Sequence, residues 1–235
     1  MKKGIVISDL HLLSWRSEGQ TRFEGLTVEL ETAETLVLNG DIFDFRWALR
    51  PHSETIPQAL EWLTALTTDF PGLDIHFIPG NHDCLPAFTN QVRAIEKISF
   101  HPHHLILGRN LFLHGDAATY RMSEKGFGKF RANWELDQPS GKTRARLYDL
   151  SDALGFSDLT HHIWFRGDIA VKRISWHLEK IRPGWKDLID HCFFGHTHLP
   201  VRGITKDGVK FFNTGSGIRG MEFHPVEFFW KPVYE

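Results

Sequence analysis

The sequence predicts an α/β fold built from two packed sheets, with strands towards both ends of the chain and helices between them. The first observation behind this prediction is a repeated design in which a short apolar run ends in a polar residue, usually beside glycine. The second is a helical spacing of apolar residues in some of the intervening stretches. The third is a late group of short strand patterns, which supplies material for a second sheet.

Strand and helix patterns alternate in the first part of the chain. Each predicted strand is an apolar run too short for a core helix, and these strands are 4–9, 35–41 and 73–79. A helix is predicted over 55–68, where apolar residues recur every three or four positions, and shorter helices are expected near 24–33 and 86–94. This order is typical of a sheet with helices on its faces.

Strand patterns return in the second half of the chain. Two short strands are predicted near 104–107 and 110–114, and a late group is predicted at 190–195, 201–204, 208–212 and 225–230. Lys206-Asp207-Gly208 is a hairpin turn signal. We read residues 1–235 as one domain.

Residues 118–187 have a different character and predict a helical insertion within that domain. Helices are expected near 121–134, 142–154 and 168–181, whereas Ile163-Trp164-Phe165 is an ambiguous strand signal. Basic residues outnumber acidic ones here, and four tryptophans lie in the same span. One interpretation is a cap with its own small core. The other is a lid whose Lys and Arg side chains meet substrate phosphates and whose apolar face accepts acyl chains.

Five predicted strands end in residue types that bind metals. These ends are Ser8-Asp9-Leu10-His11, Asn39-Gly40-Asp41-Ile42-Phe43-Asp44, Gly80-Asn81-His82-Asp83, His114-Gly115-Asp116 and Gly195-His196-Thr197-His198. Because open α/β sheets bind ligands at the carboxyl ends of their strands, we expect the five ends to converge on one site.

The donors at these ends suffice for two divalent metals with open positions for water. They are Asp9, His11, Asp41, Asn81, His114, His196 and His198. Mixed His and carboxylate sites suit Mn²⁺, with Fe or Zn²⁺ as alternatives. Asp41 lies on the middle of the first three strand ends, so it is the candidate bridge between the metals. Two such metals acidify a water and stabilise an in-line displacement at phosphorus.

His82 is the candidate catalytic residue beside these ligands. It follows Asn81 directly and is not needed as a ligand, so its imidazole is available to donate a proton to a leaving oxygen. The neighbouring Asp83 is expected to set its tautomer. Asp44 and Asp116 either orient ligating histidines or cap loops.

In this order the five motifs resemble the calcineurin-like metallophosphoesterase superfamily. The resemblance runs from Asp9 to His198 and implies a four-layer α/β/β/α sandwich of two mixed sheets with a dinuclear site. On the family pattern one metal is held by Asp9, His11, Asp41 and His198, and the other by Asp41, Asn81, His114 and His196. His82 takes the leaving-group role.

Within that superfamily the chain is most similar to the UDP-2,3-diacylglucosamine diphosphatases of lipid A synthesis. The similarity lies in the length, in Ser8-Asp9-Leu10-His11-Leu12, in Gly40-Asp41-Ile42-Phe43-Asp44-Phe45 and in a helical insertion after His114-Gly115-Asp116. It implies cleavage of a pyrophosphate to UMP and a diacylglucosamine phosphate. The best-known subgroup carries Arg where this chain has His82.

Two other function classes stay open on the residues alone. One is a phosphodiesterase, phosphomonoesterase or nuclease acting on other nucleotides or on nucleic acid, for which the basic, aromatic insertion would serve. The other is a non-catalytic scaffold of the same fold, against which the complete donor set argues. The formal net charge of −2 gives no general preference for nucleic acid.

Composition places the chain in a reducing compartment. Its two cysteines, Cys84 and Cys192, cannot build a disulfide framework. The N-terminal residues do not form a signal peptide, and no apolar run reaches the roughly 18–20 residues that span a membrane. We expect a cytoplasmic protein, either free or in peripheral contact with the inner face of the membrane, with a nucleotide or glycolipid pyrophosphate as substrate.

Three further groups of residues have plain structural interpretations. His101, His103 and His104 follow no glycine-punctuated strand end, so they are expected on the surface or in a loop, as are His161 and His162. Asn213-Thr214-Gly215-Ser216 either closes a strand near the site or forms an ordinary turn.

Overall fold

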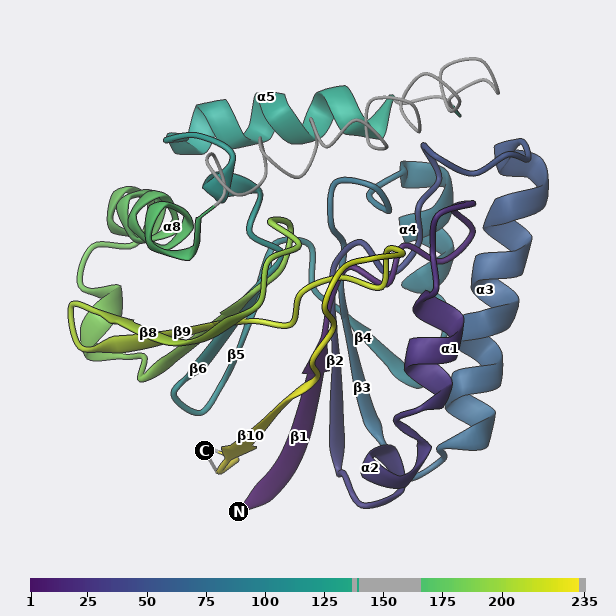
Figure 1. Cartoon of the computed structure of the whole chain (residues 1–235), viewed down its shortest axis with the longest axis horizontal. Helices are drawn as coiled ribbons and strands as arrows, with labels where there is room; N and C mark the ends of the chain where they lie inside the picture. Colours follow the sequence, from purple (N-terminus) through teal and green to yellow (C-terminus); the bar gives the residue numbers. More distant parts are fainter. Residues whose placement is uncertain (137–138, 140–165, 233–235) are drawn as a thin grey trace.

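Two five-stranded sheets pack face to face, and helices cover the outer face of each sheet (Figure 1). The computed structural model describes residues 1–136, 139 and 166–232. The strand order is β10-β1-β2-β3-β4 in the first sheet and β5-β6-β7-β9-β8 in the second. The α/β/β/α sandwich of two mixed sheets is thus confirmed.

The strands and helices lie close to the predicted positions. The strands are β1 (Lys2–Ile7), β2 (Thr35–Asn39), β3 (Asp74–Ile78), β4 (Ile98–Phe100), β5 (His104–Leu107), β6 (Asn110–Leu113), β7 (His191–Phe194), β8 (Val201–Lys206), β9 (Val209–Asn213) and β10 (Val226–Trp230). The helices are α1 (Gly19–Glu24), α2 (Thr27–Glu31), α3 (His52–Asp69), α4 (Pro86–Val92), α5 (Glu124–Glu135) and α8 (Gly167–Ile181), with 3-10 turns η1 (Asp116–Ala118) and η2 (Trp185–Asp187).

Two elements differ from the sequence-based expectation. The single helix expected near 24–33 is two short helices, α1 and α2, separated at Gly25-Leu26. Strand β4 was not predicted, because its three residues are too few to show a periodicity. The helix expected near 142–154 and the segment 163–165 lie outside the described residues. No described helix combines the length and apolar character needed to cross a membrane.

Alternating side chains of the first sheet build two separate cores. Ile5 and Ile7 of β1 face the layer of α1 to α4 and share a cluster with Leu63 of α3. Val6, between them, faces the second sheet and packs in a cluster with Phe112 and other residues between the sheets. This period of two is what a strand buried on both faces requires. A third cluster joins the outer face of the second sheet to α8.

The strand directions bring the functional loops to one edge. β1, β2, β3 and β4 run parallel, so their carboxyl ends lie on the same side of the first sheet. In the second sheet β6, β7 and β9 are also parallel. Both sets of carboxyl ends point towards the upper side of Figure 1, where α5 lies across them, whereas both chain termini lie at the opposite side.

Candidate metal centre

The five predicted strand ends converge on one buried site. Asp9 and His11 follow β1, Asp41 follows β2, Asn81 follows β3, His114 follows β6, and His196 and His198 follow β7. Asp9, His11, Asp41, Asn81 and His114 are at most 3% exposed. Side chains from both sheets therefore meet in the seam between them, which no single strand end could achieve.

The first group of facing donor atoms comes from Asp9, His11, Asp41 and His198, and these atoms lie within 4.8 Å of one another. His11 Nε2 is 3.0 Å from His198 Nε2, and His198 Nε2 is 3.4 Å from Asp9 Oδ1. Two imidazole nitrogens and two carboxylates directed at one point fit a divalent cation in both donor type and number.

The second group comes from Asp41, His114 and His196, and the Asn81 amide oxygen completes it. His114 Nε2 lies 3.2 Å from Asp41 Oδ2 and 3.3 Å from Asn81 Oδ1, and His196 Nδ1 lies 2.8 Å from the same Asn81 oxygen. Asp41 belongs to both groups. Its position between them is the one that a bridging carboxylate needs.

Asp44 is the carboxylate that orients His82. Asp44 Oδ1 lies 2.9 Å from His82 Nδ1, and its other oxygen lies 3.1 Å from His11 Nδ1. The same carboxylate therefore orients a candidate ligand and the candidate catalytic histidine, each through its Nδ1. Asp44 Oδ1 also accepts a hydrogen bond from the backbone N–H of Trp47 (2.9 Å), so Asp44 both orients histidines and caps its loop, the two alternatives that the sequence left open.

Asp83 does not contact His82, which corrects the sequence-based expectation. Its carboxylate accepts hydrogen bonds from the backbone N–H groups of Gly80 (2.6 Å), Ile42 (2.8 Å) and Phe43 (3.3 Å). The chain turns sharply after Asn81, so neighbours in sequence point in different directions. Asp83 ties the loop after β3 to the loop after β2.

Five of the seven candidate ligands have a left-handed backbone. Their φ angles lie between 50° and 66°, and they are Asp9, His11, Asp41, His196 and His198. For residues with a side chain this region is sparsely populated, and each instance costs about 1–3 kcal/mol. This backbone conformation directs each ligand side chain towards the site between the two sheets. The sequence pattern gives no sign of the left-handed conformation.

Two glycines are needed because ligand side chains lie against their backbone. A Cβ atom on Gly80 would overlap the carboxylate of Asp41, and one on Gly195 would overlap the carboxylate of Asp9. Neither glycine has a positive φ angle, so the requirement is close approach rather than conformational freedom.

The carboxylates favour positive charge on two of the imidazoles, those of His114 and His82, whereas burial lowers the pKa of His196 to about 4. Burial alone would lower the pKa of His114, but Asp41 and other nearby carboxylates raise it to about 10. Burial likewise opposes protonation of His82, yet Asp44 and Asp41 raise its pKa to about 9. Burial would raise the pKa of Asp41, but His114, His82 and His11 hold it well below its usual value. The site is electrostatically suited to bound cations.

Residues 213–216 close the end of β9 and lie beside the site, which is one of the two alternatives that the sequence left open for this segment. The Asn213 amide donates to the Gly195 carbonyl (2.9 Å) and to Thr197 Oγ1 (3.0 Å). Ser216 Oγ donates to the Asp9 carbonyl (3.0 Å). These bonds fix the loops that carry Asp9, His196 and His198.

Arg131 is a site residue that sequence reasoning did not single out. It reaches from α5 into the seam and forms an ion pair with Asp116, with Nη2 2.5 Å from Oδ2. The sequence offered one signal: Phe127, Arg131 and Trp134 recur at helical spacing and so share a face of α5.

An aromatic and cationic surface lies beside His82. The Trp134 ring centroid is 4.8 Å from that of His82, and the Arg46 guanidinium lies 4.7 Å from the Trp134 ring centroid. Trp47 then meets Trp15 edge to face at 5.6 Å. Planar rings and a guanidinium are the groups on which nucleobases stack.

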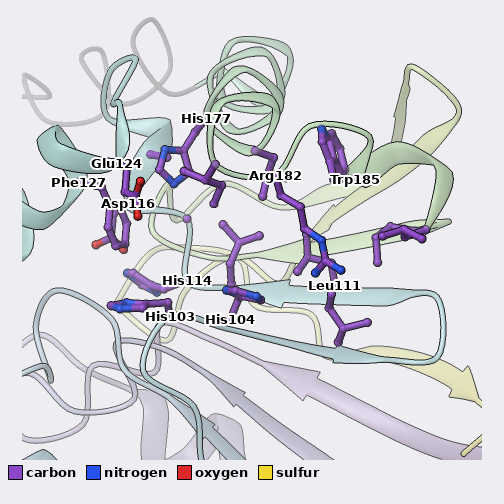
Figure 2. A pocket seen from close by; sticks show the side chains of 18 of the residues that line it. His103, His104, Leu111, His114, Asp116, Glu124, Phe127, His177, Arg182 and Trp185 are labelled. Atoms are coloured by element: carbon purple, nitrogen blue, oxygen red, sulfur yellow. The ribbon is translucent and has the colours of Figure 1, made fainter. Parts of the chain in front are cut away.

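On the other side of the centre is an apolar cavity of about 420 Å³. It lies between the outer face of the second sheet and helices α5 and α8, and it shares His114 and Asp116 with the candidate metal centre. Figure 2 shows His103, His104 and His114 together along one side of it and His177 across from them.

Within the described residues, the histidines expected on the surface lie in two different places. His103 and His104 are exposed, as expected, and they also line this cavity. His101 instead lies beside β3, where its Nε2 is 3.0 Å from His76 Nδ1. His161 and His162 lie outside the described residues.

Comparison with known proteins agrees with this architecture. A dimetal phosphatase from Danio rerio is 11% identical, with a TM-score of 0.52, and the match covers 92% of this chain and 88% of that chain. A phosphopantetheinyl hydrolase from Mycobacterium tuberculosis is 15% identical, with a TM-score of 0.47 and coverage of 99% and 98%. At 11% identity the likeness to the dimetal phosphatase shows the fold alone.

Comparison of the sequence with protein-family models identifies the family of this chain. No curated protein sequence matches the chain. The family model described as Calcineurin-like phosphoesterase matches residues 3–200, a span that contains all five strand ends of the site. The chain therefore belongs to the calcineurin-like phosphoesterase family.

Proposed function

We propose that this protein hydrolyses a phosphate ester or pyrophosphate bond with two divalent cations. The observation that carries the proposal is the pair of donor groups that share Asp41. In this proposal one cation is held by Asp9, His11, Asp41 and His198, and the other by Asp41, Asn81, His114 and His196. Mn²⁺ is the proposed metal, with Fe or Zn²⁺ as alternatives that the same donors accept.

In the proposed reaction the water would be activated by the cations, and the protein would supply the proton donor. Two bound cations supply an acidified water and neutralise charge on the phosphoryl oxygens. The chain positions His82 to donate a proton to the leaving oxygen, because Asp44 occupies its Nδ1 and leaves Nε2 to face substrate. In the metal-free site Asp44 and Asp41 raise the pKa of this imidazole to about 9, and the contact with Asp44 favours the protonated form that a proton donor needs.

For the substrate we propose UDP-2,3-diacylglucosamine, cleaved to UMP and a diacylglucosamine 1-phosphate. The motif resemblance favours it. The apolar cavity next to His114 supports an acyl chain on that side, since its volume lies in the range of ordinary ligand pockets. The surface formed by Trp134, Trp47 and Arg46 supports a nucleobase on the opposite side. A lipid substrate would place the protein at the inner face of the membrane.

The reaction class is tested with simple substrates. Hydrolysis of a bis-aryl phosphate and a mono-aryl phosphate is measured with Mn²⁺, after chelation, and with the Asp41→Asn variant. We expect turnover that chelation and the substitution each abolish. The matched control is Asp74→Asn, a surface carboxylate paired with Lys2, which should retain activity. Metal-independent turnover, or none with either ester or with UDP-2,3-diacylglucosamine, would reject the proposal.

The substrate is tested separately by filling the cavity. Ile106 lines it and is half-buried, so Ile106→Trp should obstruct an acyl chain. We expect a lower kcat/KM for UDP-2,3-diacylglucosamine and an unchanged kcat/KM for the bis-aryl ester. Val28→Trp, at a position 71% exposed on α2, is the control. Equal loss with both substrates would indicate misfolding, and no loss with either would exclude the cavity as the acyl site.

A further inference from the structure

Helix α5 buries one side chain, and that side chain is charged. Of the residues Glu124–Glu135, only Arg131 is buried, with an exposed fraction of 6%. A helix normally packs against the rest of a protein through apolar side chains. Burying a guanidinium costs free energy unless its charge is paired and its N–H groups are hydrogen-bonded. The position of Arg131 therefore calls for an explanation beyond the attachment of α5 to the sheets.

Arg131 joins two loops that come from different sheets. Its Nε and Nη2 lie 3.1 Å and 2.5 Å from Asp116 Oδ2, in the loop after β6 of the second sheet. Its Nη1 donates to the Gly80 carbonyl (2.7 Å) and its Nη2 donates to the Pro79 carbonyl (2.9 Å), in the loop after β3 of the first sheet. One guanidinium thus sets the separation of the two loops.

The two loops carry donors of the same candidate metal group. Asn81 immediately follows Gly80, and His114 lies two residues before Asp116. Asn81 Oδ1 and His114 Nε2 lie 3.3 Å apart, so a small change in loop separation would move these two donors apart. The other group takes Asp9, His11 and His198 from the loops after β1 and β7, whereas the hydrogen bonds of Arg131 within the described residues go to Asp116, Gly80 and Pro79.

Only arginine matches this set of acceptors. The guanidinium has five N–H donors in a planar fork, whereas a lysine ammonium is a compact point charge. The Asp116 carboxylate and two carbonyls lie around the rim of that fork. A lysine at this position would reach some of them and leave others without a donor.

We propose that Arg131 is a positioning residue for one of the two cation sites, the one formed by Asp41, Asn81, His114 and His196. It acts through the backbone at Pro79 and Gly80 and through Asp116, and it leaves the Asp9, His11, Asp41 and His198 site largely unaffected. This inference rests on the two-cation function proposed above. It makes the first helix of the insertion part of the metal centre.

The experiment measures Mn²⁺ binding by calorimetry to metal-free protein in which one site has been disabled. His198→Ala leaves the site that contains Asn81, and Asn81→Ala leaves the site that contains His198. Adding Arg131→Met to each background separates the two effects. We expect the dissociation constant to rise about 10–100-fold in the His198→Ala background, the usual range for losing a residue that orients a ligand, and to change less than about threefold in the Asn81→Ala background.

Lys129→Met is the matched control. Lys129 lies on the same helix, α5, and is exposed to solvent, so loss of its positive charge should change neither dissociation constant. If Arg131→Met does not fold by circular dichroism, Arg131→Lys replaces it, with a smaller rise expected in the same background only. Equal weakening in both backgrounds, or no weakening in either, would overturn the proposal.

The outcome separates this inference from the proposed function. Mn²⁺ binding is measured in the absence of substrate, so its result does not depend on whether the protein hydrolyses a phosphoester. Wild-type protein that binds two Mn²⁺ ions but hydrolyses no phosphoester would reject the proposed function and leave the role of Arg131 intact. Unchanged binding by the Arg131 variants in active protein would reject only the role of Arg131.

Discussion

At the residue scale, the site depends on how single side chains are oriented, and Asp44 is the clearest case. Its two carboxylate oxygens face His11 and His82 at 3.1 Å and 2.9 Å. One histidine is a candidate ligand and the other a candidate proton donor. Substitutions of His82 and Asp44 should therefore differ in their effect on metal content, although the two residues are in contact.

The first prediction compares His82→Ala with Asp44→Asn. His82→Ala removes the proton donor but no ligand, so kcat on the bis-aryl ester should fall about 10²–10⁴-fold while two Mn²⁺ ions remain bound. Asp44→Asn should reduce both kcat and Mn²⁺ affinity, because it also releases His11. Metal content by atomic spectroscopy and steady-state kinetics provide the measurement. Loss of Mn²⁺ from His82→Ala would show that His82 is a ligand.

The second prediction concerns pH. An isolated histidine has a pKa near 6.5, and the carboxylates around His114 raise its pKa to about 10. The metal-free site therefore holds this proton below pH 10, and a cation must displace it. Mn²⁺ affinity should rise by up to about tenfold per pH unit for one displaced proton. Calorimetric titrations of metal-free protein at pH 6.5, 7.5 and 8.5 measure this, and affinity that is flat or falls with pH would contradict it.

At the element scale, strands were easier to predict than the loops that follow them. The strands predicted at 35–41 and 73–79 correspond to β2, which is buried along its whole length, and to β3, which is buried at Ile75, Phe77 and Ile78; burial of this extent leaves a strong apolar pattern. Asp83 was expected to be the partner of His82, but the partner is Asp44. This difference was not predictable, because it depends on the direction in which the chain turns after Asn81. The left-handed backbone at Asp9 and Asp41 is likewise maintained by tertiary contacts that no local pattern encodes.

Arg131 shows the same limit for a helix. Its spacing from Phe127 and Trp134 marks one face of α5, but its acceptors are Asp116 and two backbone carbonyls from another sheet. Backbone acceptors have no sequence signature, so the helix was predictable and its role in the site was not. The candidate ligands were predictable because their residue types follow strands that are themselves easily recognised.

The third prediction contrasts two glycines. Gly80→Ala would push its Cβ into the Asp41 carboxylate, so stability should fall by about 1–3 kcal/mol and Mn²⁺ affinity should fall with it. Gly128→Ala lies in α5, and no atom of the described residues comes within 4 Å of the new Cβ, so stability should rise by about 0.5–1 kcal/mol. Thermal unfolding with and without Mn²⁺ tests both. Gly80→Ala with normal stability and metal binding would show that the Asp41 position is not tightly constrained.

At the scale of the whole molecule, the fold presents different surfaces on the two sides of one buried centre. Rings and a guanidinium lie beside His82, and an apolar cavity lies beyond His114 (Figure 2). The centre itself sits where the carboxyl ends of both sheets meet beneath α5 (Figure 1). A substrate with one aromatic polar end, a phosphate linkage and an apolar end would match this order.

The most direct test of the account is the Mn²⁺ stoichiometry of metal-free wild-type protein and of Asp41→Asn, measured by calorimetry. Asp41 is the residue shared by both donor groups, so wild type should bind two ions, and the substitution should weaken both by at least about 100-fold, the upper end of the cost of losing a residue that only orients a ligand. Wild-type protein that binds fewer than two ions, or an Asp41→Asn variant that retains either site at wild-type affinity, would contradict the shared-carboxylate centre.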